Sequence, residues 1–344
     1  MIVGIGNERF VIPNRKLDET LVSYGVEQKP HNSQMKILLK KLKPLLRWFI
    51  LGGTLFFLLK TLKDHWQEVT HLRLTSTSFV WLGLALLITS GAHLWSGWVW
   101  TWILKEFGQH FPTGRALRVY LVTNAAKYLP GNVWHFWGRI QAVSKAGSSA
   151  GTATLSVLLE PLLMAAAALL VASALSTATL GWWTILGLIA VLVGVHPRIL
   201  NQAIALLDRL KDHQNAVRLK RYLWRPLMGE VFFLLFRGAG FVAALAAISS
   251  VHISQLSILL SAFSFAWLLG LVIPGAPGGL GVFETTAIAL LEQTVIPGEL
   301  LGGVALFRLV SILAEIAAAG IAWVNGPKLE LGHLKPDAPA DPVS

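Results

Sequence analysis

The sequence predicts an all-α polytopic membrane protein with about six spanning helices and two re-entrant pairs of broken helices. Three observations lead to this fold class. Hydrophobic residues make up 54% of the 344 residues and charged residues only 14%, whereas soluble domains average about 25% charged residues. Several segments reach the roughly 17–25 apolar residues that a spanning helix needs. Two further apolar segments contain Pro-Gly steps, which interrupt a helix.

This composition excludes an ordinary soluble enzyme, a disordered chain and a collagen-like fibre. The net charge of +11 favours the headgroups of anionic lipids as partner, and no nucleic acid is expected in so apolar a chain. The chain has no Cys, so it has no disulfide, thiolate metal site or Cys nucleophile. Because no metal-ligand spacing, Gly-x-Ser-x-Gly motif or dinucleotide fingerprint occurs, we expect no metal and no cofactor.

The chain is predicted to divide into a basic, mostly disordered tail (1–44), a membrane domain (45–326) and a second tail (327–344). The first tail ends in a basic run directly before an apolar segment, which favours an anchor on anionic lipid. Within the membrane domain a first half (78–195) and a second half (227–324) flank a basic loop (196–226).

Lys and Arg in the loops set the predicted orientation, because short cytoplasmic loops carry an excess of them. The basic tail and the basic loop are therefore expected inside, which leaves both termini in the cytoplasm of a protein integral to the inner membrane. The segments that reach or approach spanning length are 45–62, 78–104, 151–175, 180–195, 227–248, 256–273 and 301–324, and 256–273 leads directly into the second break described below.

The apolar segment 117–139 is predicted to be re-entrant rather than spanning. It lies between two loops that are both expected inside, so the chain must cross an even number of times, yet three apolar segments lie there. This segment contains Lys127 and a break at Pro130 and Gly131, and irregular backbone is tolerated at membrane depth only inside protein or along a cavity. The alternative is a Pro-kinked spanning helix.

A matching break follows in the second half, where residues 273–281 hold four Gly and two Pro, Pro274 and Pro277. Such a loop lets a ligand approach the backbone closely and exposes amide N–H groups that can bind an anion. Arg139 follows the first break by 9 residues and Glu284 follows the second by 10. Interrupted segments in corresponding halves of opposite orientation are typical of an inverted-repeat transporter with its site between them. The alternative is a chance similarity.

Charges deep in apolar helices cost about 2.5–3.5 kcal/mol on insertion scales, so we expect them to pair or to function. Pairing of Glu160 and Glu284 with Arg139 or Arg308 is predicted, and Glu160, Glu284 and Arg308 would set the pairing in two states. Arg139 is the first candidate for a phosphate contact, because its guanidinium binds phosphate bidentately. The predicted substrate-binding residues are Lys127, Asn132, Arg139, Gly278, Gly279 and Gly281.

Other buried polar residues are interpreted as packing residues. His93 and His135 are expected to be hydrogen-bonded inside the protein. Glu230 and Arg237 lie seven residues apart and share a helix face, which favours intrahelical packing.

Four motifs resemble the lysylphosphatidylglycerol synthase transmembrane-region family. Residues 124–134 (NAAKYLPGNVW) with Arg139 resemble its first motif, and 156–160 (SVLLE) its apolar helix with a single Glu. Residues 277–284 (PGGLGVFE) resemble its second motif, and Arg308 its closing Arg. The resemblance covers roughly residues 44–325 and implies a flippase-like domain for anionic or aminoacylated phospholipids or polyprenyl-linked glycolipids.

Two departures from the family narrow this expectation. Residues 132–135 (NVWH) stand where many relatives have a Gly-Glu pair before the Arg, which bears on the lipid identity. The aminoacyl-transfer domain of the synthases does not follow the last helix, so lysine transfer is not expected.

The sequence therefore predicts a flippase or transporter for an anionic phospholipid or polyprenyl-linked glycolipid, and not an enzyme. One alternative is a membrane accessory or scaffold subunit for a lipid- or glycan-modifying enzyme partner. The other is an intramembrane lipid transferase, for which one Glu or His can suffice as base. The lipid, the direction and energy source of transport and the oligomeric state stay open.

Overall fold

The computed structural model describes residues 63, 74–109, 111–128, 133–175, 181–202, 219, 221–273 and 277–324. Within these ranges all regular structure is helical, which confirms the all-α fold class. Five helical stretches are long and apolar enough to cross a membrane, so the chain is a polytopic integral membrane protein. They are α3 (Ser76–Glu106), α6 (Ala150–Leu175), α9 (Trp224–Ala246), η2 (Ile253–Gln255) with α10 (Leu256–Val272), and α12 (Pro297–Val324).

All five stretches match apolar segments predicted from the sequence, and the other predicted segments are shorter or lie outside the described residues. Residues 45–62, both tails and most of the basic loop lie outside the described residues. Helix α7 (Gly181–Gly194), predicted to span, has 14 residues and is therefore only about 21 Å long. The helix bounds lie within one residue of the predicted segment 180–195 at each end, but since a bilayer core is about 30 Å thick, this helix by itself is too short for a full span.

Helices α4 (Thr113–Asn124) and α5 (Trp134–Lys145) form a hairpin that returns to its starting end. Each has 12 residues, about 18 Å of helix and too short to span. Ser148 after α5 donates a hydrogen bond to Gln109 before α4, so both ends of the hairpin meet. This agrees with a re-entrant pair and not with a kinked spanning helix. The bend itself, with Pro130, Gly131 and Asn132, lies outside the described residues.

A second hairpin consists of α10 and α11 (Val282–Leu291), joined through η3 (Pro277–Gly279). Gln255 before α10 donates from Nε2 to the carbonyl of Thr294 after α11 at 3.1 Å, so the ends of this hairpin also meet. Pro274, the first proline of the predicted break, lies outside the described residues, whereas Pro277 begins η3.

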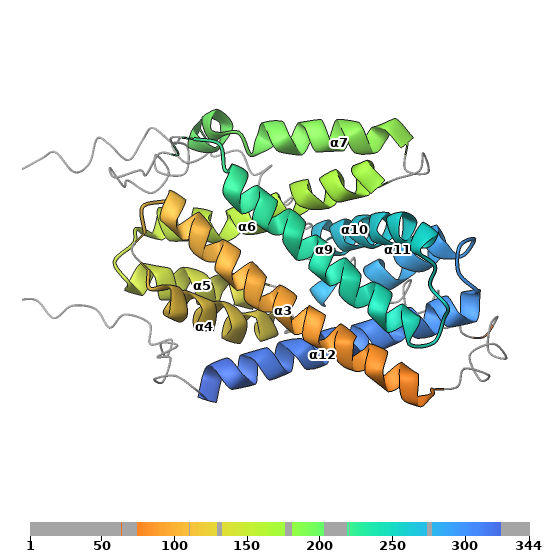
Figure 1. The fold of residues 1–344 in the computed structure, drawn as a ribbon. Helices are drawn as coiled ribbons and strands as arrows, with labels where there is room; N and C mark the ends of the chain where they lie inside the picture. The colour runs from red at the N-terminus through yellow and green to blue at the C-terminus, as the bar shows by residue number, and fades with distance from the viewer. Residues whose placement is uncertain are drawn as a thin grey trace, which may run out of the picture. The chain divides into compact units, whose positions relative to one another are not determined.

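The two hairpins open toward opposite ends of the helix bundle (Figure 1). Arg118 of α4 donates from Nε to the carbonyl of Ala322, near the end of α12, at 2.8 Å. Gln255 instead lies beyond the C-terminal end of α9, where Leu245 packs on Gly303 near the start of α12. The hairpin tips η1 (Ala125–Tyr128) and η3 touch each other. This is the arrangement of an inverted repeat.

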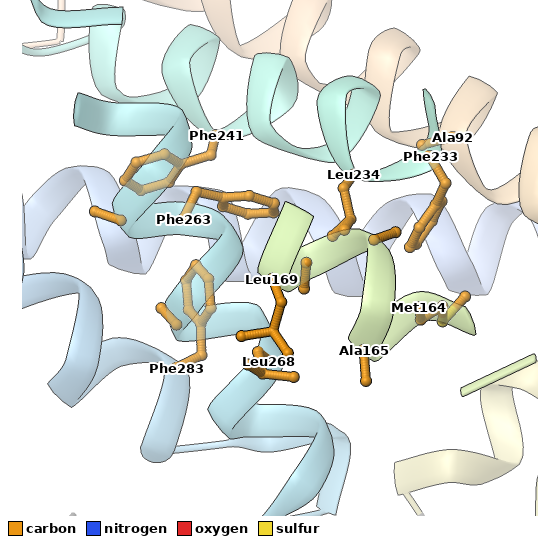
Figure 2. Packing of buried hydrophobic residues seen from close by; sticks show 14 of the residues in the cluster. Ala92, Met164, Ala165, Leu169, Phe233, Leu234, Phe241, Phe263, Leu268 and Phe283 are labelled. Atoms are coloured by element: carbon orange, nitrogen blue, oxygen red, sulfur yellow. The ribbon is translucent and has the colours of Figure 1, made fainter. Parts of the chain in front are cut away.

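Aromatic side chains of the second hairpin pack against those of α9 and α12 (Figure 2). Phe241 of α9 packs on Phe263 of α10 with ring centroids 5.7 Å apart and on Phe307 of α12 at 5.5 Å. Phe263 also contacts Phe283 of α11 edge-on at 5.5 Å. Because each ring contacts rings from other helices, the four helices are held in fixed register next to the hairpin tips.

Candidate functional site

A cavity of about 290 Å³ lies where the hairpin tips meet. Lys127 of η1, Arg237 of α9 and Arg308 of α12 line it, together with Gly278 and Gly279 of η3. Its described lining holds these three cations and no carboxylate. A smaller cavity of about 90 Å³ shares with it Lys127, His135, Phe136, Pro161, Trp267 and Leu271. An anion at the hairpin tips would therefore meet cationic side chains first.

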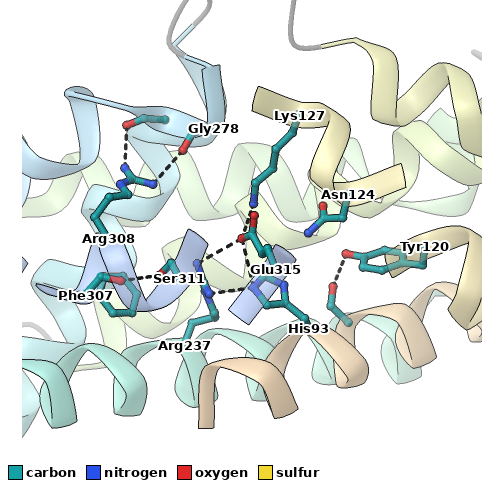
Figure 3. A network of polar contacts seen from close by, with 12 residues as sticks. His93, Tyr120, Asn124, Lys127, Arg237, Gly278, Phe307, Arg308, Ser311 and Glu315 are labelled. Atoms are coloured by element: carbon teal, nitrogen blue, oxygen red, sulfur yellow. Dashed lines mark hydrogen bonds and ion pairs between the residues drawn. The ribbon is translucent and has the colours of Figure 1, made fainter. Parts of the chain in front are cut away.

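A four-residue group beside the cavity, here called the Glu315 cluster, consists of His93, Lys127, Arg237 and Glu315 (Figure 3). Lys127 Nζ donates to Glu315 Oε1 at 2.6 Å. His93 Nε2 lies 3.1 Å from the same oxygen and 3.1 Å from Arg237 Nη1. Arg237 Nη2 lies 4.0 Å from Glu315 Oε1. One carboxylate thus joins η1, α3, α9 and α12, and it faces two cations.

The Arg139–Glu160 ion pair lines the smaller cavity and is almost completely buried. Arg139 donates from Nη1 to Glu160, and from Nε to Thr123 Oγ1 at 3.3 Å. The Tyr120 hydroxyl donates to Glu160 Oε1 at 2.6 Å, and the Arg139 guanidinium carbon lies 3.8 Å from the centre of the Tyr120 ring. Arg139 does not line the larger cavity. Its phosphate contact stays a prediction, which this conformation does not show.

The Arg308–Glu284 ion pair lies at the second hairpin tip and borders the larger cavity. Arg308 donates from Nε to Glu284 Oε1 at 2.5 Å, and from Nη1 and Nη2 to the carbonyls of Gly278 and Gly279 at 3.2 and 3.3 Å. The amide of Gly281 donates to Glu284 Oε2 at 2.6 Å. The predicted amide donors for a ligand stay a prediction. In this conformation the loop turns the carbonyls of Gly278 and Gly279 toward Arg308, and the Gly281 amide donates to Glu284.

Glycine is required at position 279 for two reasons. Its φ of +71° lies in the left-handed region, and a Cβ built there would lie 3.1 Å from Cα and O of Gly270 on α10. The tip of the second hairpin therefore packs backbone against backbone. This close approach brings the Gly278 and Gly279 carbonyls to the cavity wall.

Sequence reasoning placed Lys127, Gly278 and Gly279 at the site but gave too small a role to three residues. Arg237, Glu315 and His93 all belong to the Glu315 cluster, yet His93 was assigned to packing and Arg237 to intrahelical packing with Glu230. The structure does not pair Arg237 with Glu230, because Arg237 turns to His93. The signal available in the sequence was the charge itself, deep in an apolar helix.

The described ranges contain no group of three His, Asp or Glu side chains arranged to hold a metal ion. The site instead consists of ion pairs set around an apolar-walled cavity between inverted hairpins. A family model described as the lysylphosphatidylglycerol synthase TM region matches residues 45–319. The chain belongs to this family. The match covers about four fifths of the chain and includes both hairpins and both ion pairs.

Membership confirms the family that the four motifs resemble. It indicates a membrane domain with a lipid-related, flippase-like role. No curated protein matches the chain.

Proposed function

We propose that this protein moves an anionic lipid across the cytoplasmic membrane, with the headgroup phosphate bound in the larger cavity by Lys127, Arg237 and Arg308. The observation that carries the proposal is the cationic lining where the two inverted hairpins meet. Ammonium and guanidinium groups bind phosphate oxygens through charge-assisted hydrogen bonds. The volume of about 290 Å³ is close to the lower end of small-molecule sites, about 300 Å³, and suits a headgroup rather than a whole lipid.

The position of the cavity favours a lipid over a soluble anion. Leu158 of α6 lines the cavity and is 42% exposed, so the cavity wall reaches the outer surface of the bundle. Trp134 and Trp137 on α5 are also exposed. In a membrane this surface faces acyl chains. A lipid can therefore place its headgroup in the cavity while its tails stay in the bilayer.

The inverted hairpins supply a way to alternate access between the two sides. With the basic loops in the cytoplasm, as proposed from their charge, the α4–α5 hairpin enters from inside and the α10–α11 hairpin from outside. Rocking one half against the other would open the shared site to either side, as in other inverted-repeat carriers. The Arg308–Glu284 pair borders the cavity and would exchange partners with the phosphate, whereas Arg139 and Glu160 would stay paired.

The test is transport by the purified full chain in liposomes that carry fluorescently labelled phosphatidylglycerol or labelled phosphatidylcholine. A membrane-impermeant reductant added outside bleaches only the outer-leaflet label, so transport appears as faster loss of the protected fraction. We expect phosphatidylglycerol to move about tenfold faster than phosphatidylcholine, because the choline cation meets the cationic lining. Equal rates for both lipids would contradict an anion-selective site.

A matched pair of variants locates the site. Lys127→Met removes a cavity cation, whereas Lys105→Met makes the same change at an exposed position outside this cavity. We expect transport to fall at least tenfold in Lys127→Met and to stay within about twofold in Lys105→Met. Unchanged transport in Lys127→Met would contradict the site.

The same purified protein distinguishes transport from the two alternative functions, an accessory subunit and a lipid transferase. No transport, together with a stable complex with a lipid- or glycan-modifying enzyme, would support the accessory role instead. Chemical turnover of the labelled lipid would support a transferase. We propose transport without chemistry because Glu160, Glu284 and Glu315, the acids nearest the cavity, each contact a cation.

A further inference from the structure

Glu230 differs from the other buried acids of the protein. It is completely buried on α9, and neither carboxyl oxygen has a hydrogen-bond partner among the described residues. The carbonyl of the preceding Gly229 accepts a hydrogen bond from Trp95 Nε1 at 2.8 Å, which seats α9 closely on α3 at this point. A buried carboxylate without donors is costly, and binding a proton removes its charge.

The groups around Glu230 do not supply a cation of its own. Glu160 and Arg139 are the charged side chains that act on it most strongly, and they already bind each other. Helix α10, which also packs on α9, carries no charged residue. The buried titratable and charged groups of α3, α12 and α9 itself are His93, Arg237 and Glu315, with the part-buried Arg308 on α12 and the buried Tyr120 on α4.

The balance of formal charge in the core depends on Glu230. The described core contains four cations, Lys127, Arg139, Arg237 and Arg308, and four acids, Glu160, Glu230, Glu284 and Glu315. When all are ionised the group is neutral. When Glu230 holds a proton, the eight groups together carry one excess positive charge. This excess charge lies in the Glu315 cluster, which has two cations for one carboxylate. That cluster borders the cavity, so one monoanion bound there restores neutrality.

We propose that Glu230 is a proton-binding site linked to the anion site, so that binding of an anionic headgroup and binding of a proton favour each other. The inference rests on the proposed function, because it uses the same cavity. Glu230 lies seven residues from Arg237 on one helix face, a separation of about 10 Å along the axis. At this distance and an effective dielectric constant of about 20, an ionised Glu230 weakens anion binding about tenfold. A proton gradient would then drive the lipid in the direction of proton flow.

Calorimetry on the purified full chain tests this linkage. A short-chain phosphatidylglycerol is titrated into the protein at one pH in two buffers with different ionisation enthalpies, and the difference in heat gives the protons taken up. We expect an affinity that falls about tenfold between about pH 6 and pH 9 and, as proton linkage then requires, a net uptake that peaks at about half a proton per lipid within this range. The phosphodiester keeps its single charge over this range, so the change must come from the protein.

Two variants assign the proton. Glu230→Gln is neutral at every pH, so we expect its affinity to match the low-pH value of the wild type throughout, with no uptake from this group. Glu106→Gln changes an acid paired with Arg221 at the bundle end and should keep both the uptake and the pH dependence. Should Glu230→Gln fail to fold, Glu230→Asp keeps a titratable carboxyl and should keep the uptake.

The outcomes separate the two proposals. Lipid binding without proton uptake in the wild type would overturn the inference and leave the proposed function standing. Uptake that persists in Glu230→Gln would also overturn it, since another group would hold the proton. Absence of lipid binding at every pH would overturn the proposed function, and the inference with it.

Discussion

In the first hairpin region the side chains of Arg139 and Glu160 are only 2% and 3% exposed, whereas those of Arg308 and Glu284 in the second are 16% and 9% exposed. The partners differ as well. The Tyr120 side chain completes the first pair, and backbone groups of the glycine-rich tip complete the second. The same two residue types therefore form an enclosed pair in one half and a pair at a cavity wall in the other.

This difference suggests that the ion pairs of the two halves have different roles. Removing either partner of an enclosed ion pair strongly destabilises the protein, because the remaining charge stays buried away from water. A pair at a cavity wall can exchange one partner for a ligand at smaller cost. We therefore expect the first pair to govern stability and the second to govern transport.

The largest effect on stability should come from Glu160→Gln. The change leaves the Arg139 guanidinium without its carboxylate inside the protein, which costs about 3–5 kcal/mol. The measurement is the free energy of unfolding in detergent, followed by tryptophan fluorescence. The matched variant Glu284→Gln should lose only about 1 kcal/mol, since water can reach its partner. Equal losses in the two variants would show that the hairpins do not differ in this way.

The transport rate should depend more strongly on the Arg308–Glu284 pair than on the Arg139–Glu160 pair. In Arg308→Met the phosphate loses a charge-assisted contact worth about 1.5–3 kcal/mol, so the transport rate should fall about 10- to 100-fold. The free energy of unfolding should change much less than in Glu160→Gln. Arg115→Met, at an exposed Arg that lies over Phe111, serves as control and should transport normally. A folded Arg308→Met variant with full activity would place the headgroup elsewhere.

Local sequence features predicted the two hairpins because their signals are local. A Pro-Gly step inside an apolar run interrupts a helix, and four Gly within nine residues mark an irregular tip. The bounds of α7 were predictable as well, since Gly181–Gly194 lies within one residue of the apolar segment 180–195 at each end. Whether a helix of about 21 Å crosses the bilayer depends on its tertiary packing, which composition does not show.

The Glu315 cluster could not be predicted in the same way. Its members come from four elements, and α3 and α12 are apolar around most of their circumference. Periodicity therefore does not show which face carries His93 or Glu315. Which acid binds which cation depends on helix rotation and on the depth of each hairpin tip, and both are properties of the folded bundle. The sequence could show only that these charges required partners.

A smaller effect is expected from Gly279→Ala at the tip of the second hairpin. Alanine would have to adopt a φ of +71° and place its Cβ 3.1 Å from the Gly270 backbone, a strain of about 1–3 kcal/mol. The free energy of unfolding should fall by this amount, and transport should slow as the carbonyls leave Arg308. Gly91→Ala on α3, with nothing within 4 Å of the new Cβ, is the control. A harmless Gly279→Ala would mean that the tip has room to adjust.

The smallest effect is expected from Arg221→Gln, which breaks an ion pair of almost ideal geometry at the end of the bundle. Arg221 donates to both carboxylate oxygens of Glu106, from Nε at 3.1 Å and from Nη2 at 2.7 Å, yet its side chain is 75% exposed. The hydrogen bonds to Glu106 raise the pKa of Arg221 further above its ordinary value, so on the alkaline side the Arg221–Glu106 attraction is kept until the pH rises through that raised pKa.

We therefore expect the melting temperature of Arg221→Gln to equal that of the wild type at neutral pH, at low and at high salt, because water and ions already screen this pair. This variant tests the premise of the comparison between the hairpins. Arg221–Glu106 has better hydrogen-bond geometry than Arg308–Glu284 but far more exposure. A fall in melting temperature as large as that of Glu160→Gln would show that pairing itself, and not burial, sets the cost of losing a partner. The different exposure of the two hairpin pairs would then not account for separate roles.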